Sequence, residues 1–270
     1  MAHWLEIIRK RNSCRSFDSK PLSAEEVASL EQAFTQCLEN PFGASVRLPV
    51  LDSAKLAGKK LGTYGVIRGA TTYFAGVVKA GSKASEGLGW SMENAILKAA
   101  ALGMGTCWLA GTYNKEDFSH AVPMKDDERI VCVSPIGHAA DRRALLDTMM
   151  RGAAGSARRK PWSALFFDGS LDKPLTEPAA GEWCDALEAV RLAPSASNNQ
   201  PWRVKKQGGD FHFFRHTGHG DITRVDMGIA ACHFELVARD LGLPGGWTIA
   251  DPGIGGNKIA YSFTWSQPIG

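Results

Sequence analysis

The stretches APSASNNQPW (residues 193–202) and RNSCRSF (residues 11–17) are the two most informative parts of this 270-residue chain. The first combines two prolines with amides and small side chains, which is typical of a tight, ordered turn. The second places two arginines on either side of a serine and ends on an aromatic residue. Because the two stretches lie in opposite halves of the chain, a site that uses both must join distant segments.

The two halves of the chain resemble each other. The residue types at positions 9, 10, 13, 17 and 18 recur 150 positions later. A second echo, Ala-x-x-Leu-Gly-x-x-x-x-Trp, occurs at 99–108 and again, 139 positions later, at 238–247. A period this long excludes a solenoid. We predict two related units, residues 1–150 and a shortened second unit of residues 151–270, which share one core.

Composition indicates a globular cytoplasmic protein. Hydrophobic residues make up 44% and charged residues 22% of the chain, and the net charge is only +3. Nucleic-acid binding needs a clustered cationic face, and the one dense cluster, residues 158–160, is interpreted as a solvated linker between the units. The six cysteines form no Cys-x-x-Cys pair, which favours free thiols in a reducing compartment. The start has no signal-peptide pattern and no apolar run approaches about 20 residues, so we predict no membrane partner.

Three histidines, at positions 212, 216 and 219, raise the question of a metal site. If the first lies in a strand and the others in a turn, their rings need not converge, and no cysteine supports zinc. We therefore predict no bound metal.

Hydrophobic periodicity predicts the same kinds of element in both halves. In the first half we expect a short helix at residues 4–10, a capped helix from 24 to about 38, extended chain at 41–52, a strand at 71–78, a buried helix at 90–102 and a strand at 130–136. In the second half we expect a helix at 181–192, a hairpin of strands 202–206 and 211–215, a buried helix at 227–241 and a strand at 259–265.

The two opening stretches resemble the motifs of the nitroreductase family of flavoproteins. Members carry an Arg-x-Ser-x-Arg-x-Phe opening and an Ala-Pro-Ser-x-x-Asn-x-Gln-Pro-Trp turn. Each half of this chain resembles one family unit, so the resemblance covers nearly the whole chain. It implies an α+β sandwich, in which helices cover a mixed or antiparallel sheet. It also implies FMN, which the family binds across a homodimer interface: one subunit supplies the arginine motif and its partner supplies the turn.

Each half of this chain departs from the family pattern in a different way. In the second half, Pro161 and Leu165 replace the two arginines. In the first half, the stretch Glu39–Leu48 keeps neither amide of the turn. Every surviving motif can therefore belong to one site. The resemblance implies a covalently fused pseudo-dimer, monomeric with further self-association left open, that binds one FMN per chain.

The resemblance also implies roles for individual residues. Arg11, Ser13 and one of Arg142 or Arg143 would bind the phosphate, and Arg15 and Arg68 are candidates to stabilise the anionic reduced flavin. A backbone N–H at Ala110 or Gly111 would face flavin N5, which makes these two the catalytic positions. The complete set expected to bind FMN is Arg11, Ser13, Arg15, Arg68, Leu109, Ala110, Gly111, Arg142, Arg143, Pro194, Ser195, Ala196, Asn198 and Gln200.

The implied activity is that of an FMN-dependent oxidoreductase. NAD(P)H would reduce the flavin, which would then pass electrons to a small aromatic or quinone-like acceptor. The competing hypothesis is a flavin-binding protein without turnover, a sensor or a scaffold. We expect Arg11→Ala to lower FMN affinity and Arg159→Ala, at the matching position of the second unit, to leave it unchanged.

Overall fold

The computed structural model describes residues 4–53, 56, 61–140, 158–220, 222–253 and 258–268, and the chain divides into two compact units. The amino-terminal unit is Lys10–Ala154, and the carboxy-terminal unit combines Met1–Arg9 with Gly155–Gly270. Helix α1 (Trp4–Lys10), except for its last residue, therefore belongs to the carboxy-terminal unit. The sequence repeat predicts that it belongs to the first unit instead. The expected boundary at residue 150 falls outside the described residues and stays a prediction.

The amino-terminal unit contains an antiparallel sheet. Its strands follow the order β1-β3-β5-β4, and β2 also pairs with β3. The central strand β3 is buried over its first seven residues, and its register with β5 runs from Thr72 opposite Ile136 to Lys79 opposite Glu128. The strands are β1 (Val46–Arg47), β2 (Val50–Asp52), β3 (Thr72–Lys79), β4 (Gly105–Thr106) and β5 (Glu128–Gly137).

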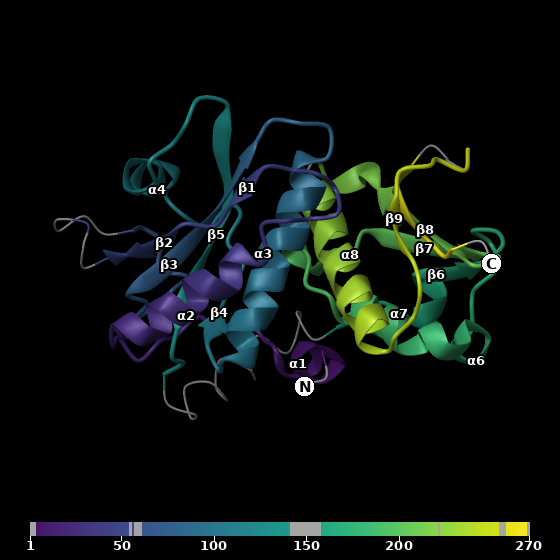
Figure 1. The fold of residues 1–270 in the computed structure, drawn as a ribbon, viewed down its shortest axis with the longest axis horizontal. Helices are drawn as coiled ribbons and strands as arrows, with labels where there is room; N and C mark the ends of the chain where they lie inside the picture. The colour runs from purple at the N-terminus through teal and green to yellow at the C-terminus, as the bar shows by residue number, and fades with distance from the viewer. Residues whose placement is uncertain are drawn as a thin grey trace. The chain divides into compact units, whose positions relative to one another are not determined.

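Two helices, α2 (Ala24–Thr35) and α3 (Ala84–Ala101), pack on one face of this sheet, and α4 (Lys115–Ala121) packs on the other (Figure 1). The predicted cap of α2 is a capping box: Ser23 Oγ accepts the backbone N–H of Glu26, whose carboxylate accepts the backbone N–H of Ser23. The predicted helix at 90–102 begins six residues earlier, at Ala84. No side chain caps its start, and two glycines in its first turns weaken the helical pattern of the sequence there.

The carboxy-terminal unit contains a mixed sheet with the order β6-β7-β8-β10-β9. Only β6 and β7 run parallel, and the predicted hairpin of β7 and β8 turns through Gly208, with a φ of 58°. The strands are β6 (Phe166–Asp168), β7 (Trp202–Gln207), β8 (Asp210–His216), β9 (Gly246–Thr248) and β10 (Ile259–Ser266). Helices and two such sheets confirm the predicted α+β fold class.

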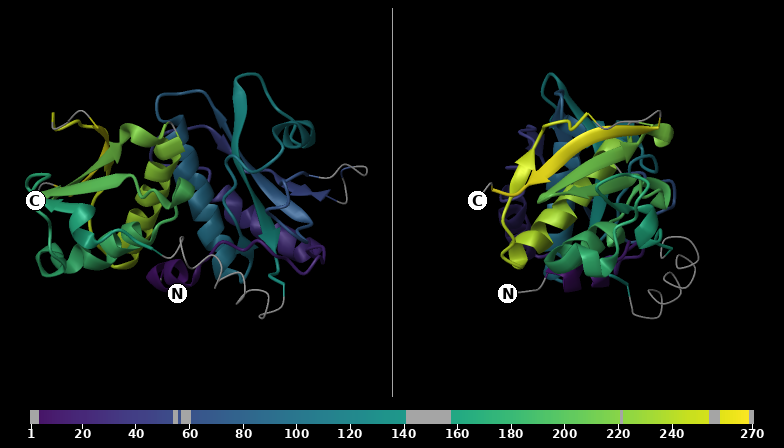
Figure 2. Two further views of the ribbon diagram at one scale, coloured as in Figure 1. Left: turned by 180° about the vertical axis from the view of Figure 1, so that it is seen from behind. Right: turned by 90° about the vertical axis from the view of Figure 1, so that its right-hand side faces the viewer.

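Aromatic side chains form the core between this sheet and its helices. Phe234 on helix α8 contacts the rings of Trp183, Phe211, Phe213 and Trp247. Figure 2 shows α7 and α8 on the same side of the strands. The helices are α6 (Glu177–Ala180), α7 (Cys184–Leu192) and α8 (Ile222–Asp240), with short 3-10 turns η2 (Trp162–Ala164), η3 (Gly181–Trp183), η4 (Ala196–Asn198) and η5 (Thr217–His219).

The two units share a connectivity. In each, a strand leads into a long helix, the helix into a short strand, and that short strand pairs with the last strand of the sheet: β3-α3-β4-β5 and β8-α8-β9-β10. Two residues after the end of each long helix lies a glycine with a positive φ, 79° at Gly103 and 72° at Gly242. The residue after each glycine donates its N–H, at 2.9 Å, to the carbonyl five residues back, at Ala99 and Ala238. The repeated sequence motif therefore has the same local geometry, that of a Schellman cap, in both units.

The tryptophan of the repeated motif makes the same kind of hydrogen bond in both units. Trp108 donates its indole N–H to Glu93 at 2.6 Å, and Trp247 donates its own to Glu235 at 2.9 Å. Both acceptors lie on the long helix of their unit, so each tryptophan fixes its own segment against that helix.

Two of the three histidines that raised the question of a metal site make hydrogen bonds within the protein. His212 Nδ1 is 2.8 Å from Thr264 Oγ1, and His216 Nδ1 accepts the backbone N–H of Gly218 at 3.3 Å. Within the described residues there is no group of three His, Cys, Asp or Glu side chains that fits a metal ion. The helices in these same ranges are all too short or too polar to cross a membrane.

Candidate functional site

The arginine motif at residues 11–17 lies between two other segments of the amino-terminal unit. Ser13 forms a parallel bridge with Thr106, whose carbonyl accepts the N–H of Cys14 at 2.8 Å. On the other side, Arg68 N–H donates to the Arg15 carbonyl and Arg68 O accepts from Phe17, both at 2.9 Å. These backbone bonds join the motif to Arg68 and to β4, just before the loop at 109–111 that was also predicted to belong to the site.

The side chains of this region are positively charged. Among the described residues, Arg11, Arg15 and Arg68 have no carboxylate and no other hydrogen-bonding partner for their guanidinium groups. Burial raises the pKa of the Cys107 thiol, while the charge of Arg15, a hydrogen bond with Ser13 and the charge of Arg11 oppose the rise. The side chains of Arg15, Ser13 and Arg11 therefore lie near enough to Cys107 to affect its thiol.

The loop after β4 presents unpaired backbone donors. Leu109 is buried and exchanges both of its backbone hydrogen bonds with Val133 at 2.9 Å. The next two N–H groups, of Ala110 and Gly111, have no acceptor anywhere in the part of the chain that the structure describes. Ala110 is half-buried and Gly111 is exposed, so both N–H groups remain available to a ligand.

The second motif forms a strained turn in the carboxy-terminal unit. Three of its residues have positive φ values without being glycine: Ser197 at 49°, Asn198 at 54° and Gln200 at 46°. Such residues are uncommon, and a run of them persists only where surrounding contacts impose it.

Residues 158–160 supply many of those contacts. Asn198 Oδ1 accepts from Arg159 at 2.9 Å, and its amide nitrogen donates to the carbonyl of Arg158 at 2.8 Å. Gln200 is only 3% exposed and accepts the N–H of Lys160 at 2.7 Å. The interpretation of this basic cluster as a solvated linker is wrong, because its charges and carbonyls bind the polar groups of the turn. Arg159 is for the same reason unsuitable as a neutral control for Arg11.

The start of the turn is held from the helix side. Ser195 Oγ accepts the N–H of Gln200 at 2.9 Å, and Ala196 N–H donates to Asp226 Oδ1 on α8 at 3.0 Å. Asp226 was not among the predicted site residues. The available signal was a single acidic residue inside the mainly apolar run from Val225 to Cys232.

Comparison with known proteins identifies the family. Residues 3–238 match the family model described as "Putative TM nitroreductase". The chain is a member of this nitroreductase family. Among solved structures, a Thermotoga maritima nitroreductase is similar over 98% of this chain and 94% of its own, with 19% sequence identity and a TM-score of 0.65. This likeness over the full length confirms the predicted fold.

Other solved nitroreductases match about half of this chain. Nitroreductases from Bacteroides fragilis and Desulfitobacterium hafniense, both crystallised with FMN, each cover 52% of this chain and 90% and 91% of their own. Their identities are 17% and 19%, and their TM-scores are 0.41 and 0.43. No curated protein matches the chain.

Two further predicted residues of this nitroreductase, Arg142 and Arg143, lie outside the described residues. The segment that leads to them follows the arginine motif: Asp18 N–H donates to the carbonyl of His138 at 3.1 Å, and Ala140 N–H to that of Ser16 at 3.0 Å.

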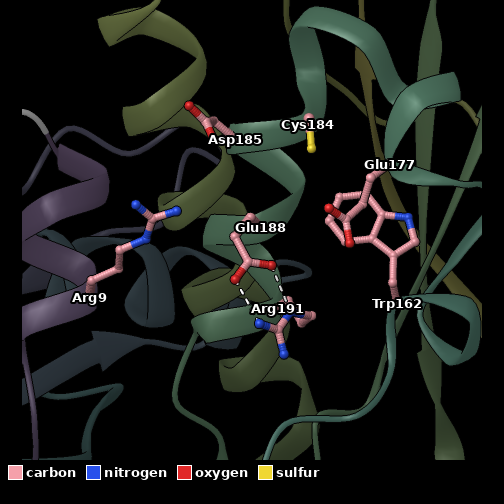
Figure 3. Close-up of a pocket in the computed structure, with 7 residues that line it drawn as sticks. All are labelled: Arg9, Trp162, Glu177, Cys184, Asp185, Glu188 and Arg191. Atoms are coloured by element: carbon pink, nitrogen blue, oxygen red, sulfur yellow. Dashed lines mark hydrogen bonds and ion pairs between the residues drawn. The ribbon is translucent and has the colours of Figure 1, made fainter.

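A hollow of about 500 Å³ lies in the carboxy-terminal unit, and none of the predicted site residues line it (Figure 3). Glu188 and Arg191 form a two-pronged ion pair there, at 2.6 and 2.7 Å. Burial, followed by the carboxylates of Glu177, Asp185 and Glu188, raises the pKa of Cys184. With three carboxylates around it, this hollow is unsuited to a phosphate. Its lining residues are Arg9, Trp162, Glu177, Cys184, Asp185, Glu188 and Arg191.

Proposed function

We propose that this nitroreductase is an FMN-dependent oxidoreductase that binds one FMN per chain, with the arginine motif and the turn at residues 193–202 as its binding segments. The observation that carries the proposal is that the side chains of Arg11, Arg15 and Arg68 have no acidic partner among the described residues. Positive charge without a protein counter-charge fits an anionic ligand.

The donor set suits the chemistry of FMN from end to end. Arg11 and Ser13 would hold the phosphate, since a guanidinium and a hydroxyl both donate to phosphate oxygens. Arg15 and Arg68 would lie toward the pyrimidine part of the ring. The unpaired N–H groups of Ala110 and Gly111 match a ring nitrogen that accepts a hydrogen bond.

When bound, FMN would supply the redox chemistry, the transfer of a hydride or electrons from NAD(P)H to a small aromatic or quinone-like acceptor. The chain itself needs no acid–base pair. Its residues bind the phosphate, orient the ring and place positive charge beside it.

The two segments that would build a second FMN site pack in the core or close a loop instead. Leu165, in place of the second arginine, is fully buried, and the rings of its neighbours Trp162 and Phe166 pack edge to face with centroids 4.5 Å apart. In the first half, Asn40 closes its own loop, because Oδ1 accepts from Phe42 and Ala44 while Nδ2 donates to the carbonyl of Ala44 at 2.8 Å. Neither segment retains the donors that FMN needs, which supports a single FMN.

The test combines stoichiometry with turnover. Purified protein is incubated with excess FMN, desalted, and its flavin-to-protein ratio measured by absorbance; we expect a ratio of one. Oxidation of NADH and of NADPH is then followed with a quinone and with a nitroaromatic acceptor. A colourless protein contradicts the proposal, and a ratio of two contradicts the single site. Stoichiometric flavin without turnover favours the non-catalytic flavin-binding protein.

A further inference from the structure

Asp226 occupies an unusual position beside the strained turn. It lies on α8, is only 2% exposed, and accepts the N–H of Ala196 through Oδ1 at 3.0 Å. Its second oxygen, Oδ2, is buried and has no hydrogen-bond partner among the described residues. A buried carboxyl group with one unsatisfied oxygen lowers the stability of a fold, so stability alone does not explain this residue.

The pKa of Asp226 reflects this burial. Burial raises the pKa of Asp226 to about 7, and the hydrogen bond from Ala196 opposes the rise only in part. The helix therefore carries a carboxyl group that the surrounding protein keeps poorly solvated.

The matching position in the amino-terminal unit is occupied by a glycine. The 139-residue offset of the repeated motif aligns Asp226 with Gly87 on α3. A Cβ at Gly87 would collide with Ala44 Cβ and lie 2.6 Å from Asn40 Oδ1, so the loop before β1 rests directly on α3. In the carboxy-terminal unit, a carboxylate stands between α8 and the turn before β7 and binds that turn.

Other contacts hold the turn at different residues. Arg159 and Lys160 contact it at Asn198, Asn199 and Gln200. Asp226 is bonded to Ala196, directly before the first residue with a positive φ. Residues with positive φ relax toward ordinary conformations unless the contacts on both sides of them persist.

We propose that Asp226 is a positioning residue for the cofactor-binding turn: by holding the N–H of Ala196, it keeps residues 197–200 in the conformation that receives FMN. The inference rests on the proposed function. It assigns Asp226 no contact with FMN and no part in the redox chemistry.

The test compares three variants. Asp226→Ala removes the acceptor, Asp226→Asn keeps an oxygen that accepts the Ala196 N–H, and Glu235→Gln neutralises another buried acid on α8 that binds Trp247 instead of the turn. FMN affinity is measured by quenching of flavin fluorescence, at a temperature where unfolding curves show every variant folded. We expect Asp226→Ala to raise the Kd about tenfold. The other two variants should stay within about threefold of the unsubstituted protein.

A second readout does not depend on FMN. Hydrogen–deuterium exchange of peptides covering residues 193–202 is compared in the ligand-free proteins. We expect faster exchange in Asp226→Ala than in Asp226→Asn and Glu235→Gln.

The two readouts separate this inference from the proposed function. If the unsubstituted protein binds no FMN, the proposed function fails, while the exchange rates still decide whether Asp226 orders the turn. Equal exchange in Asp226→Ala and the unsubstituted protein overturns the inference. So does an equal loss of FMN affinity in Asp226→Ala and Asp226→Asn, because the Asn side chain retains the acceptor.

Discussion

Arg11 carries a positive charge that no described acidic residue neutralises, and its neighbour in the motif, Arg15, shares this property. Both side chains are only half exposed, so the absence of a protein partner is not explained by free solvation. A charge-assisted hydrogen bond contributes about 1.5–3 kcal/mol, which corresponds to roughly 10- to 100-fold in a binding constant.

We predict that Arg11→Ala lowers FMN affinity by this amount, as measured by flavin fluorescence titration. Arg129→Ala is a suitable control, because Arg129 is exposed in the same unit and outside the candidate site. An equal loss in the two variants would show that overall charge, rather than the motif, attracts the ligand.

Asp226 also makes a prediction about stability. Its pKa is raised to about 7 in the folded chain, so ionisation disfavours folding above the ordinary Asp value near 3.8, and this penalty is complete above about pH 7. Asp226→Asn should therefore raise the melting temperature more at pH 8 than at pH 4. Thermal unfolding followed by circular dichroism at both pH values tests this, and a gain that does not depend on pH would contradict it.

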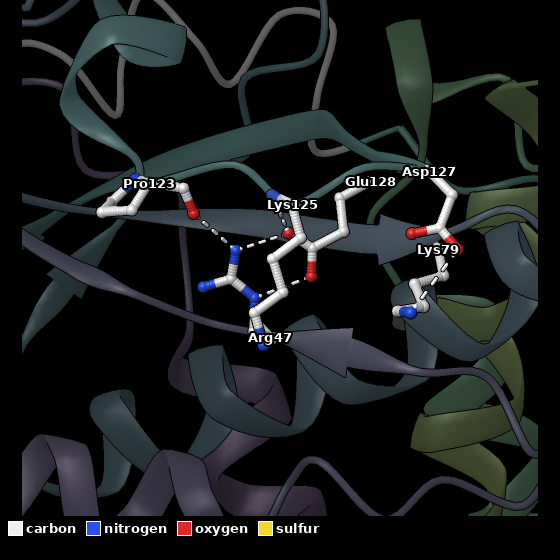
Figure 4. Close-up of polar contacts among 6 residues, drawn as sticks. All are labelled: Arg47, Lys79, Pro123, Lys125, Asp127 and Glu128. Carbon is white, nitrogen blue, oxygen red and sulfur yellow. Dashed lines mark hydrogen bonds and ion pairs between the residues drawn. The ribbon is translucent and has the colours of Figure 1, made fainter.

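Among the elements, β1 is tied to β5 by an ion pair that spans the sheet, since β3 runs between them (Figure 4). Arg47 contacts both carboxylate oxygens of Glu128, at 2.9 and 2.7 Å, and donates to the carbonyl of Pro123 at 2.9 Å. Hydrogen bonding to Arg47 is the largest of the causes that lower the pKa of Glu128 to about 2.

We predict that Arg47→Met lowers the melting temperature at pH 7, and that the difference shrinks as the pH falls from about 4.5 toward 2. A lowered folded-state pKa stabilises the fold above the unfolded value and loses that contribution as the carboxylate is protonated. Lys79→Met is the control, because the Lys79–Asp127 pair is longer, at 3.4 Å, and more exposed. A pH-independent difference would argue against this ion pair as the cause.

The glycines that follow the two long helices also lead to a prediction about stability. At Gly242 a Cβ would meet no atom within 4 Å, so the cost of Gly242→Ala comes only from its φ of 72°. The left-handed conformation costs an L-residue about 1–2 kcal/mol. We expect this loss in chemical denaturation, and little change for Gly246→Ala, which has equal space and no positive φ. Similar losses in the two variants would contradict the conformational explanation.

At the scale of the whole molecule, periodicity and caps predicted most elements, because their signals are local. Ser23 and Glu26 marked the start of α2, and the Gly-Gly pair at 208–209 marked the hairpin of β7 and β8. Strand β6 was missed because three residues give no period, and the start of α3 because Lys83 provides no cap.

Candidate site residues could be named where the sequence carries a motif, and not where they depend on distant contacts. Within one unit, the arginine motif bonds to Arg68 and to Thr106, which lies three residues before the loop at 109–111. The roles of residues 158–160 and of Asp226 come from tertiary hydrogen bonds, for which the sequence has no local pattern. The grouping of α1 with the carboxy-terminal unit has the same origin, since Trp4 N–H binds Asp240 at 3.1 Å.

The aromatic core around Phe234 has a practical consequence for spectroscopy. Of the eight tryptophans, all except Trp90 and Trp108 belong to the carboxy-terminal unit, where Trp247 and Trp265 have ring centroids 5.1 Å apart. Intrinsic indole emission will therefore report mainly on the melting of that unit. Loss of order around the arginine motif needs a reporter of its own, and the visible colour of a captured flavin would provide one.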